Sequence, residues 1–197
     1  MNIGVCGGTF DPFHRGHLEP VLAIRGEMQW DRVIYVPAWR QPFKADRSTT
    51  SGYHRFTMAV LATRHDDTIY VSPLELERGG ISYTVETLQE LHEIFPDATF
   101  DWILGEDNVS QLLDWKHPDR LFALARFVVL ARGGPAPSPE LAARVAAGRL
   151  VCAQNESVLI SSTDIRKRVR AGESIDEFVD PAVSRYIHHY GLYKEAT

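Results

Sequence analysis

The 197-residue sequence has few cysteines, no surplus of basic charge and no long apolar run. Its two cysteines, Cys6 and Cys152, lie far apart, and neither belongs to a CxxC pair. This usage is more typical of a reducing compartment than of a secreted protein built on disulfides. The N-terminus reaches glycine and aspartate too early for the apolar core of a signal peptide. We therefore expect a cytoplasmic protein.

Charge and hydropathy exclude two further classes of protein. Lysine and arginine number 21 against 26 aspartates and glutamates, so the net charge is −5. Proteins that grip duplex nucleic acid through its phosphates usually carry a basic surplus, so we expect no nucleic-acid partner. No run approaches the roughly 18 apolar residues of a membrane span, so we expect no membrane segment.

Short apolar runs alternate with stretches of helical periodicity along the whole chain. The runs predict strands at residues 3–6, 33–36, 69–72, 100–104, 127–131 and 150–153. Helices are predicted over 18–30, 51–61 with Ser51 as cap, 84–94, 106–125 with a break at Pro118, 141–147, and twice after residue 161. The stretches 38–50, 75–81 and 133–139 are predicted to be loops.

This alternation predicts an α/β fold, namely a Rossmann-like open parallel sheet with helices on both faces. We expect one domain over residues 1–197, with a C-terminal helical segment at about 161–197. Ligands of such sheets bind outside the carboxyl ends of the strands, so residues that follow strands are the candidates for function.

The first predicted strand runs into the string GGTFDPFHRGH, residues 7–17. Two glycines let the backbone approach a ligand closely, and amides at the start of the next helix can donate to an anion. His14 and His17 share one face of that helix, and Thr9 adds a hydroxyl donor. Neither GxxxxGK[ST] nor GxGxxG is present, which excludes a Walker loop and a redox dinucleotide fingerprint. Taken alone, the two histidines could also be zinc ligands together with a third residue. They could equally be surface histidines with no binding role.

A second candidate phosphate site is the string ISSTDIR, residues 160–166. Hydroxyls at the positive end of a helix can cap it or donate to an anion. Arg166, one turn into the helix, can fork onto phosphate oxygens. Taken alone, these residues fit an ordinary capped helix with a basic face equally well. Arg168 and Arg170 are expected to point to solvent.

Together these strings resemble the HxGH nucleotidyltransferase superfamily, whose signature (G)xFDPxHxGH matches residues 7–17. Over nearly its full length the sequence is similar to the bacterial nicotinate-nucleotide adenylyltransferase family. The resemblance implies transfer of the adenylyl group of ATP to nicotinic acid mononucleotide, giving deamido-NAD and pyrophosphate in NAD biosynthesis. It assigns catalysis to His14, His17 and Arg166. It assigns ATP binding to Gly8, Thr9, Phe10, Ser162 and Thr163, with Arg132 as a further candidate.

The resemblance also points to the middle of the chain for the mononucleotide. Residues 77–84 resemble the family's stretch that ends in Ser-Tyr-Thr. The candidates are Lys44, Ser82, Tyr83, Thr84, Asp107 and Trp115, with Trp115 expected to stack on the pyridine ring. Phe43 and Glu106 depart from the family pattern, which usually has histidine and alanine there. By residue type alone, Ser82 fits a helix cap nearly as well, and a tryptophan such as Trp115 is more often a half-buried core residue.

These residues are phosphate donors rather than a nucleophile and its base. A mononucleotide phosphate is mostly a dianion at pH 7, so its attack on ATP requires no general base. We expect Mg²⁺ as a cofactor held mainly through substrate phosphates, with no protein metal site. The alternatives are another HxGH enzyme, acting on nicotinamide mononucleotide or phosphopantetheine, and a non-catalytic nucleotide-sensing module. The sequence leaves a homo-oligomer open. It does predict that the two ends of the chain meet at one anion site.

Overall fold

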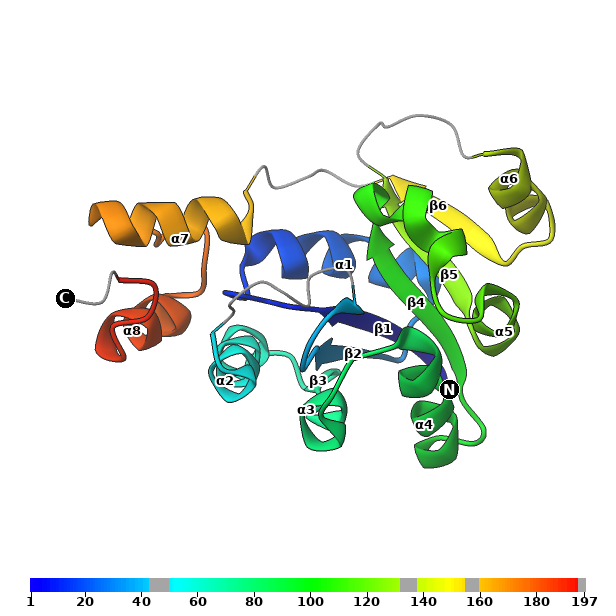
Figure 1. Ribbon diagram of the computed structural model, residues 1–197, viewed down its shortest axis with the longest axis horizontal. Coiled ribbons are helices and arrows are strands. Elements are labelled where there is room, and N and C mark those ends of the chain that lie inside the picture. The colour runs from blue at the N-terminus through cyan, green and yellow to red at the C-terminus, as the bar shows by residue number, and fades with distance from the viewer. Residues whose placement is uncertain (43–49, 132–137, 155–159, 195–197) are drawn as a thin grey trace.

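In the part of the chain that the structure describes, six strands form one parallel sheet at the centre of the protein (Figure 1). The structure, a computed structural model, describes residues 1–42, 50–131, 138–154 and 160–194. The strands are β1 (Asn2–Gly8), β2 (Arg32–Pro37), β3 (Ile69–Val71), β4 (Thr99–Gly105), β5 (Arg126–Ala131) and β6 (Leu150–Gln154). Each neighbouring pair is parallel, which confirms the predicted α/β sheet.

The strand order is β3-β2-β1-β4-β5-β6. The chain builds outward from β1 in one direction and then returns to add β4 on its other side. The order therefore reverses between β1 and β4, which is where open α/β sheets bind ligands. Cys6 of β1 pairs in register with Tyr35 of β2 and with Ile103 of β4. The loops after β1, β2 and β4 consequently emerge side by side.

Four helices cover one face of the sheet: α1 (Arg15–Met28), α2 (Gly52–Thr63), α7 (Ser162–Ala171) and α8 (Pro181–His189). Alternate strand positions supply the buried side chains beneath them, because successive strand residues point to opposite faces. The cluster includes Cys6, Tyr35, Ile103, Val128, Val21, Ile24, Met58, Ile165, Val169, Val183 and Ile187. The C-terminal helices thus share a core with the N-terminal strand.

The opposite face is covered by α4 (Thr84–Ile94), the 3₁₀ helix η2 (Glu106–Asp114), α5 (Pro118–Leu124) and α6 (Pro139–Ala146). Its buried cluster includes Ile3, Val5, Ile34, Val36, Phe100, Trp102, Phe127, Val129, Val85, Leu88, Leu91, Leu121 and Leu141. Strands buried on both faces explain why their sequences are continuous apolar runs. Among the described residues, no helix has the length and apolar character needed to cross a bilayer.

The structure corrects the prediction that 75–81 is a loop. The short helix α3 (Leu74–Arg78) occupies most of it and ends at Gly79, whose φ is +69°. A helix of five residues is too short to show a hydrophobic period, so the pattern could not reveal it. Ser51 does occupy the cap position of α2, but its side chain makes no capping hydrogen bond. The break predicted at Pro118 is present: η2 ends at Asp114, and α5 begins at Pro118.

Candidate active site

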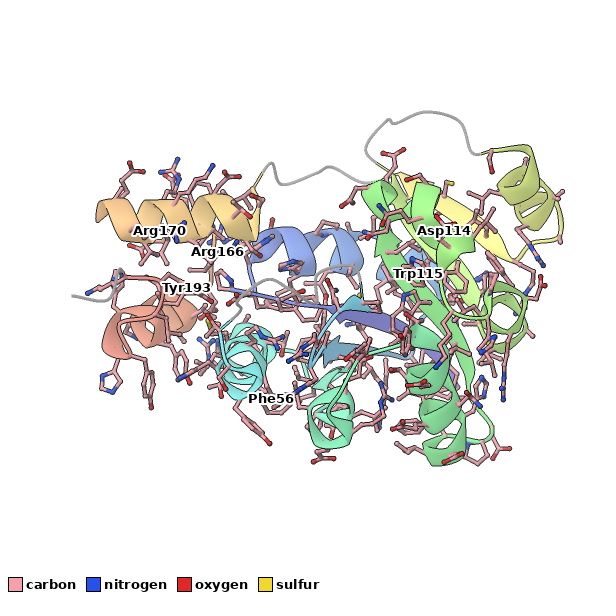
Figure 2. All side chains as sticks on the ribbon, in the orientation of Figure 1. Phe56, Asp114, Trp115, Arg166, Arg170 and Tyr193 are labelled. Atoms are coloured by element: carbon pink, nitrogen blue, oxygen red, sulfur yellow. The ribbon has the colours of Figure 1, made fainter. Side chains whose placement is uncertain are left out.

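Two segments from opposite ends of the chain meet just beyond the carboxyl end of β1. Nη1 of Arg166 donates to the carbonyl oxygen of Asp11 at 2.7 Å. The hydroxyl of Ser162 donates to the carbonyl oxygen of Pro12 at 3.0 Å. Figure 2 shows Arg166 on α7, close to the start of α1. The prediction that the two ends of the chain meet is therefore confirmed.

The C-terminal region holds the same loop at two more points. The backbone N–H of Arg15 donates to the carbonyl oxygen of Phe178 at 2.9 Å. The hydroxyl of Tyr193 donates to Oδ1 of the buried Asp11 at 2.7 Å. Burial, together with the nearby Asp11 carboxylate, raises the pKa of Tyr193 well above its usual value, so it remains a hydrogen-bond donor at neutral pH. Sequence reasoning missed Tyr193, because nothing in its local sequence marks its partner.

The two histidines lie at the start of α1, with ring centroids 3.7 Å apart. The backbone N–H of His14 donates to Nδ1 of His17 at 3.2 Å. A neutral His17 ring therefore carries its proton on Nε2, which makes that nitrogen a donor. The His17 ring meets Phe10 edge-on at 5.0 Å and packs against Phe13 at 5.4 Å. This aromatic bed, together with the hydrogen bond to Nδ1, fixes the orientation of the His17 ring.

The glycine turn after β1 is shaped by Phe10. This residue has a φ of +53° and is buried, and its ring folds back over Gly8. A Cβ added at Gly8 would lie 2.7 Å from that ring, so a larger residue does not fit there. Since the Phe10 side chain belongs to the core, any contact of Phe10 with ATP would come from its backbone. The Thr9 hydroxyl oxygen is buried, and within the described part of the chain it has no hydrogen-bond partner.

Helix α7 presents its hydroxyl residues in different ways. Ser161 is the cap, and its oxygen accepts the backbone N–H of Asp164 at 3.1 Å. Thr163 is exposed, and its hydroxyl accepts from Nη2 of Arg166 at 3.1 Å. Arg170 is exposed as expected. The Arg168 side chain is also solvent-exposed, and there it pairs with Glu173 at 3.1 Å and lies over the Phe178 ring.

Ser82 joins the loop after β2 to the segment before α4. Its hydroxyl oxygen accepts the backbone N–H of Trp39 at 3.0 Å, and its own N–H donates to the carbonyl oxygen of Arg40 at 2.9 Å. Ser82 is buried, whereas the side chains of Trp39 and Arg40 are exposed. Ser82 therefore does not act as a helix cap. Its two hydrogen bonds hold the loop after β2 against the segment before α4.

Tyr83 lies close to the segment that carries Trp115. Nζ of Lys116 lies 4.2 Å from the centroid of the Tyr83 ring and 2.6 Å from Oε1 of Glu86. Trp115 is half-buried and meets Phe127 edge-on at 6.4 Å. The structure thus places the Ser-Tyr-Thr segment and the Trp115 segment in contact through Lys116. Thr84, the first residue of α4, is partly exposed beside Tyr83.

The candidates fall into two groups. The histidine cluster comprises Gly8, Thr9, Phe10, His14, His17, Ser162, Thr163 and Arg166. The tryptophan cluster comprises Ser82, Tyr83, Thr84 and Trp115. Figure 2 shows Arg166 and Trp115 on clearly separate parts of the molecule, so the clusters are distinct.

Asp107 is exposed at the start of η2 and belongs to neither cluster by a direct contact. Its carboxylate folds toward Gly105, where an added Cβ would lie 2.6 Å from Oδ1. Glu106 is half-buried beside it. Burial, and secondarily the charge of Glu106, raise the pKa of Cys152. Cys6 packs in the buried cluster of the other face, and this burial raises its pKa far above the usual value.

Lys44, Phe43 and Arg132 lie outside the described residues, so their predicted roles stay predictions. Within the described ranges, no group of three or more His, Cys, Asp or Glu side chains could hold a metal ion.

Sequence reasoning also missed Arg55, which lies on α2 and is 1% exposed. Its guanidinium donates to four backbone carbonyls: Thr9 at 2.6 Å, Ala38 at 2.6 Å, Thr50 at 2.9 Å and Trp39 at 3.4 Å. Desolvation lowers its pKa, an effect that the nearby Asp11 opposes. A lone arginine inside a predicted amphipathic helix carries no signal of this kind in the sequence.

Glu75 is a second buried charged residue that the sequence did not reveal. It lies two residues before the stretch 77–84 that resembles the family, whose first residue, Glu77, is exposed. Oε1 of Glu75 accepts from the Thr87 hydroxyl at 2.5 Å. Desolvation raises the pKa of Glu75, although Thr87, Ser82 and Arg78 each lower it. Its hydrogen bond with Ser82 links this carboxyl to the tryptophan cluster.

Comparison with known proteins identifies the family. Residues 5–168 match the model of the cytidylyltransferase-like family. A Roseiflexus protein is 40% identical over 195 residues, covering 98% of each chain, and a Thermoanaerobacter protein is 39% identical over 201 residues, covering 99% of this chain and 95% of the relative. Both carry the name "Probable nicotinate-nucleotide adenylyltransferase".

Solved structures confirm the fold. Plasmodium falciparum nicotinic acid mononucleotide adenylyltransferase complexed with NaAD superimposes with a TM-score of 0.77 at 22% identity, covering 98% of this chain and 97% of that one. The same protein complexed with APC gives 0.76 at 20% identity, covering 98% of this chain and 96% of that one. The chain therefore belongs to the cytidylyltransferase-like family and, within it, to the nicotinate-nucleotide adenylyltransferases.

Proposed function

We propose that the protein transfers the adenylyl group of ATP to nicotinic acid mononucleotide, giving deamido-NAD and pyrophosphate in NAD biosynthesis. The names of its full-length relatives support this activity. The observation that carries it is the junction of the chain ends, where Arg166 and Ser162 bond to the loop that bears the two histidines. A triphosphate requires donors of this kind around one position.

The chemistry is an in-line displacement at phosphorus. An oxygen of the mononucleotide phosphate attacks the α-phosphorus of ATP and forms a new P–O bond. The bond from the α-phosphorus to the bridging oxygen breaks, and pyrophosphate leaves with that electron pair. Because the attacking phosphate is already largely a dianion, the protein supplies alignment and charge stabilisation rather than a base.

We assign the donor roles to the histidine cluster. The Nε2 proton of His17, with Nδ1 engaged by the backbone, suits an oxygen on the phosphorus that becomes more negative in the transition state. Arg166 neutralises the departing pyrophosphate. Gly8, Thr9, Ser162 and Thr163 contact the triphosphate through backbone or hydroxyl groups, and Arg132 adds a cation after β5.

The tryptophan cluster receives the mononucleotide. Trp115 stacks on the pyridine ring, while Ser82, Tyr83 and Thr84 bind the carboxylate side of the nucleotide. Lys44 and Asp107 contact its phosphate and ribose. Support comes from the contact of Tyr83 with Lys116, because it brings these two segments of the chain together.

Mg²⁺ fits this site as a companion of ATP. The donors assembled in the histidine cluster are nitrogen and hydroxyl groups, whereas Mg²⁺ prefers carboxylate and phosphate oxygens. We therefore propose that the ion binds mainly through substrate phosphates and there reduces the repulsion between the two polyanions.

We also propose a cytoplasmic location. Cys6 and Cys152 are both free thiols, as is usual in a reducing compartment.

The direct experiment measures pyrophosphate release from ATP with nicotinic acid mononucleotide, with nicotinamide mononucleotide, with phosphopantetheine, and with no acceptor. We expect the fastest release with the nicotinate form and an equal amount of deamido-NAD. Faster turnover of another acceptor would overturn the substrate and leave adenylyl transfer intact. No release with any acceptor would overturn the function and favour a nucleotide-sensing module.

A further inference from the structure

We propose that Arg55 is a positioning residue for adenylyl transfer: it sets the spacing between the histidine cluster and the tryptophan cluster and so aligns the two bound nucleotides. The inference rests on the proposed function, because it concerns the alignment of that function's two substrates. Arg55 itself lies below the loops and, being 1% exposed, acts through the backbone rather than on substrate.

A continuous path of hydrogen bonds runs from one cluster to the other through Arg55. Nη1 reaches the carbonyl of Thr9 in the histidine cluster, and Nη2 reaches the carbonyl of Ala38 in the loop after β2, each at 2.6 Å. The next residue, Trp39, donates its backbone N–H to Ser82 of the tryptophan cluster at 3.0 Å. One guanidinium thus holds both loops that carry candidate substrate contacts.

The contacts of Arg55 lie where the sheet stops holding these loops. The backbone N–H of Ala38 donates to the carbonyl oxygen of Gly8 at 2.8 Å, next to the last register pair of β1 and β2. Beyond this point no strand pairing among the described residues fixes the two loops relative to each other, and Arg55 bridges them instead.

The chemistry of arginine suits this role. A guanidinium is a rigid plane with five donors, so two of its nitrogens hold two carbonyl oxygens at a set separation. A lysine ammonium is a single point charge on a flexible stem and cannot impose that separation. Burying a charge is costly, and an apolar side chain would fill the same space without that cost. Packing alone therefore does not account for an arginine at this position.

Misalignment of two reactants lowers turnover more than it lowers affinity. Each nucleotide still finds its own contacts when the two loops shift relative to each other. A displacement of about 1 Å at the reacting atoms is enough to cost roughly 10²-fold in rate. Loss of the Arg55 bridge should therefore appear in kcat rather than in the binding of either nucleotide alone.

The test uses Arg55→Lys and Arg55→Ala. For each variant we would measure kcat per folded molecule at saturating nucleotides, and the Kd of nicotinic acid mononucleotide and of a non-hydrolysable ATP analogue, each alone. We expect kcat to fall roughly 10- to 100-fold with both Kd values changing far less. Lysine keeps the positive charge and the aliphatic part of the side chain. Arg55→Lys is therefore the decisive variant if Arg55→Ala does not fold.

Arg126→Ala is the matched control. Arg126 donates through Nε to the buried Asp101 at 2.8 Å, but it lies at the amino end of β5, away from the loops. Its loss should lower Tm and leave kcat per folded molecule unchanged. An equal loss of kcat in Arg126→Ala, or full kcat in Arg55→Lys, would overturn the positioning role.

Chemical rescue separates positioning from loss of stability. Millimolar guanidinium should partly restore kcat of Arg55→Ala in a saturable way, whereas urea at the same concentration should not. Equal effects of the two additives would contradict the proposal. Absence of pyrophosphate release by the unmodified chain with every acceptor would instead reject the underlying function, so the two failures are distinguishable.

Discussion

At the scale of the residue, the hydrogen bond to His17 decides which ring nitrogen can act on a phosphate. Nδ1 is engaged by the backbone of His14, so Nε2 is the donor. We expect His17→Ala to lower turnover by about 10²- to 10³-fold, as for the loss of one transition-state donor. His17→Asn should lose nearly as much, while His17→Gln, which returns an N–H near Nε2, should retain more. Pyrophosphate release measures all three variants.

The control for His17 is His65→Ala. His65 is exposed just beyond the end of α2, away from the histidine cluster. It should turn over at the normal rate. Near-normal turnover of His17→Ala would remove His17 from its assigned role.

The residues that could be predicted from the sequence are those that form a local string. GGTFDPFHRGH and ISSTDIR each concentrate donors within a few positions, so residue type and spacing were informative. Arg55 and Tyr193 could not be predicted, because their partners are distant in sequence and, for Arg55, are backbone carbonyls. A carbonyl is present at every position and therefore leaves no mark in the amino-acid sequence.

At the scale of the element, adjacent serines at the start of α7 have different tasks. Ser161 caps the helix, whereas Ser162 bonds to Pro12 in the first loop. Ser161→Ala should lower the free energy of unfolding by about 1 kcal/mol, as for the loss of a helix cap. Ser162→Ala should raise the KM for ATP with a smaller effect on stability. Urea denaturation and initial rates at varied ATP would distinguish them; a reversed pattern would contradict this division.

A pH-dependent contribution to stability comes from Glu75 beneath the tryptophan cluster. Desolvation raises its pKa in the folded protein, so above its usual pKa of about 4.3 the folded state binds more protons than the unfolded state. Stability due to this group is therefore fully present at low pH and falls as pH rises through the raised pKa. Glu75→Gln stays neutral at every pH, so its stability should not show this fall with rising pH.

Urea denaturation of both chains between pH 4 and pH 8 tests this. The wild type should lose stability relative to Glu75→Gln as the pH rises. A difference that is constant with pH would show that the hydrogen bonds from Thr87 and Ser82 balance desolvation, and one that grows in favour of the wild type would show that they outweigh it. Either result would contradict the prediction.

Most elements followed from hydrophobic pattern, since six apolar runs became the six strands. The order of those strands did not follow, because pairing depends on contacts between segments that are distant in sequence. Helix α3 was missed for the different reason that its five residues are fewer than two turns.

At the scale of the whole molecule, the fold brings the N-terminal loop and the C-terminal helices together at the place where we propose the phosphate site. The two ends share a buried cluster on one face of the sheet, and hydrogen bonds of Arg166, Ser162 and Tyr193 join them at its edge. Figure 1 shows α7 and α8 beside α1 and α2, opposite the side of the molecule that carries α6.

The most direct measurement of this joint site is a double-mutant cycle on pyrophosphate release with His17→Ala, Arg166→Ala and the double variant. When two residues act as a unit on one transition state, the double variant loses far less turnover than the product of the two single fold-losses. We expect the fold-loss of the double variant to be smaller than this product. Fold-losses that multiply would show that the two ends act independently, and would contradict a single phosphate site.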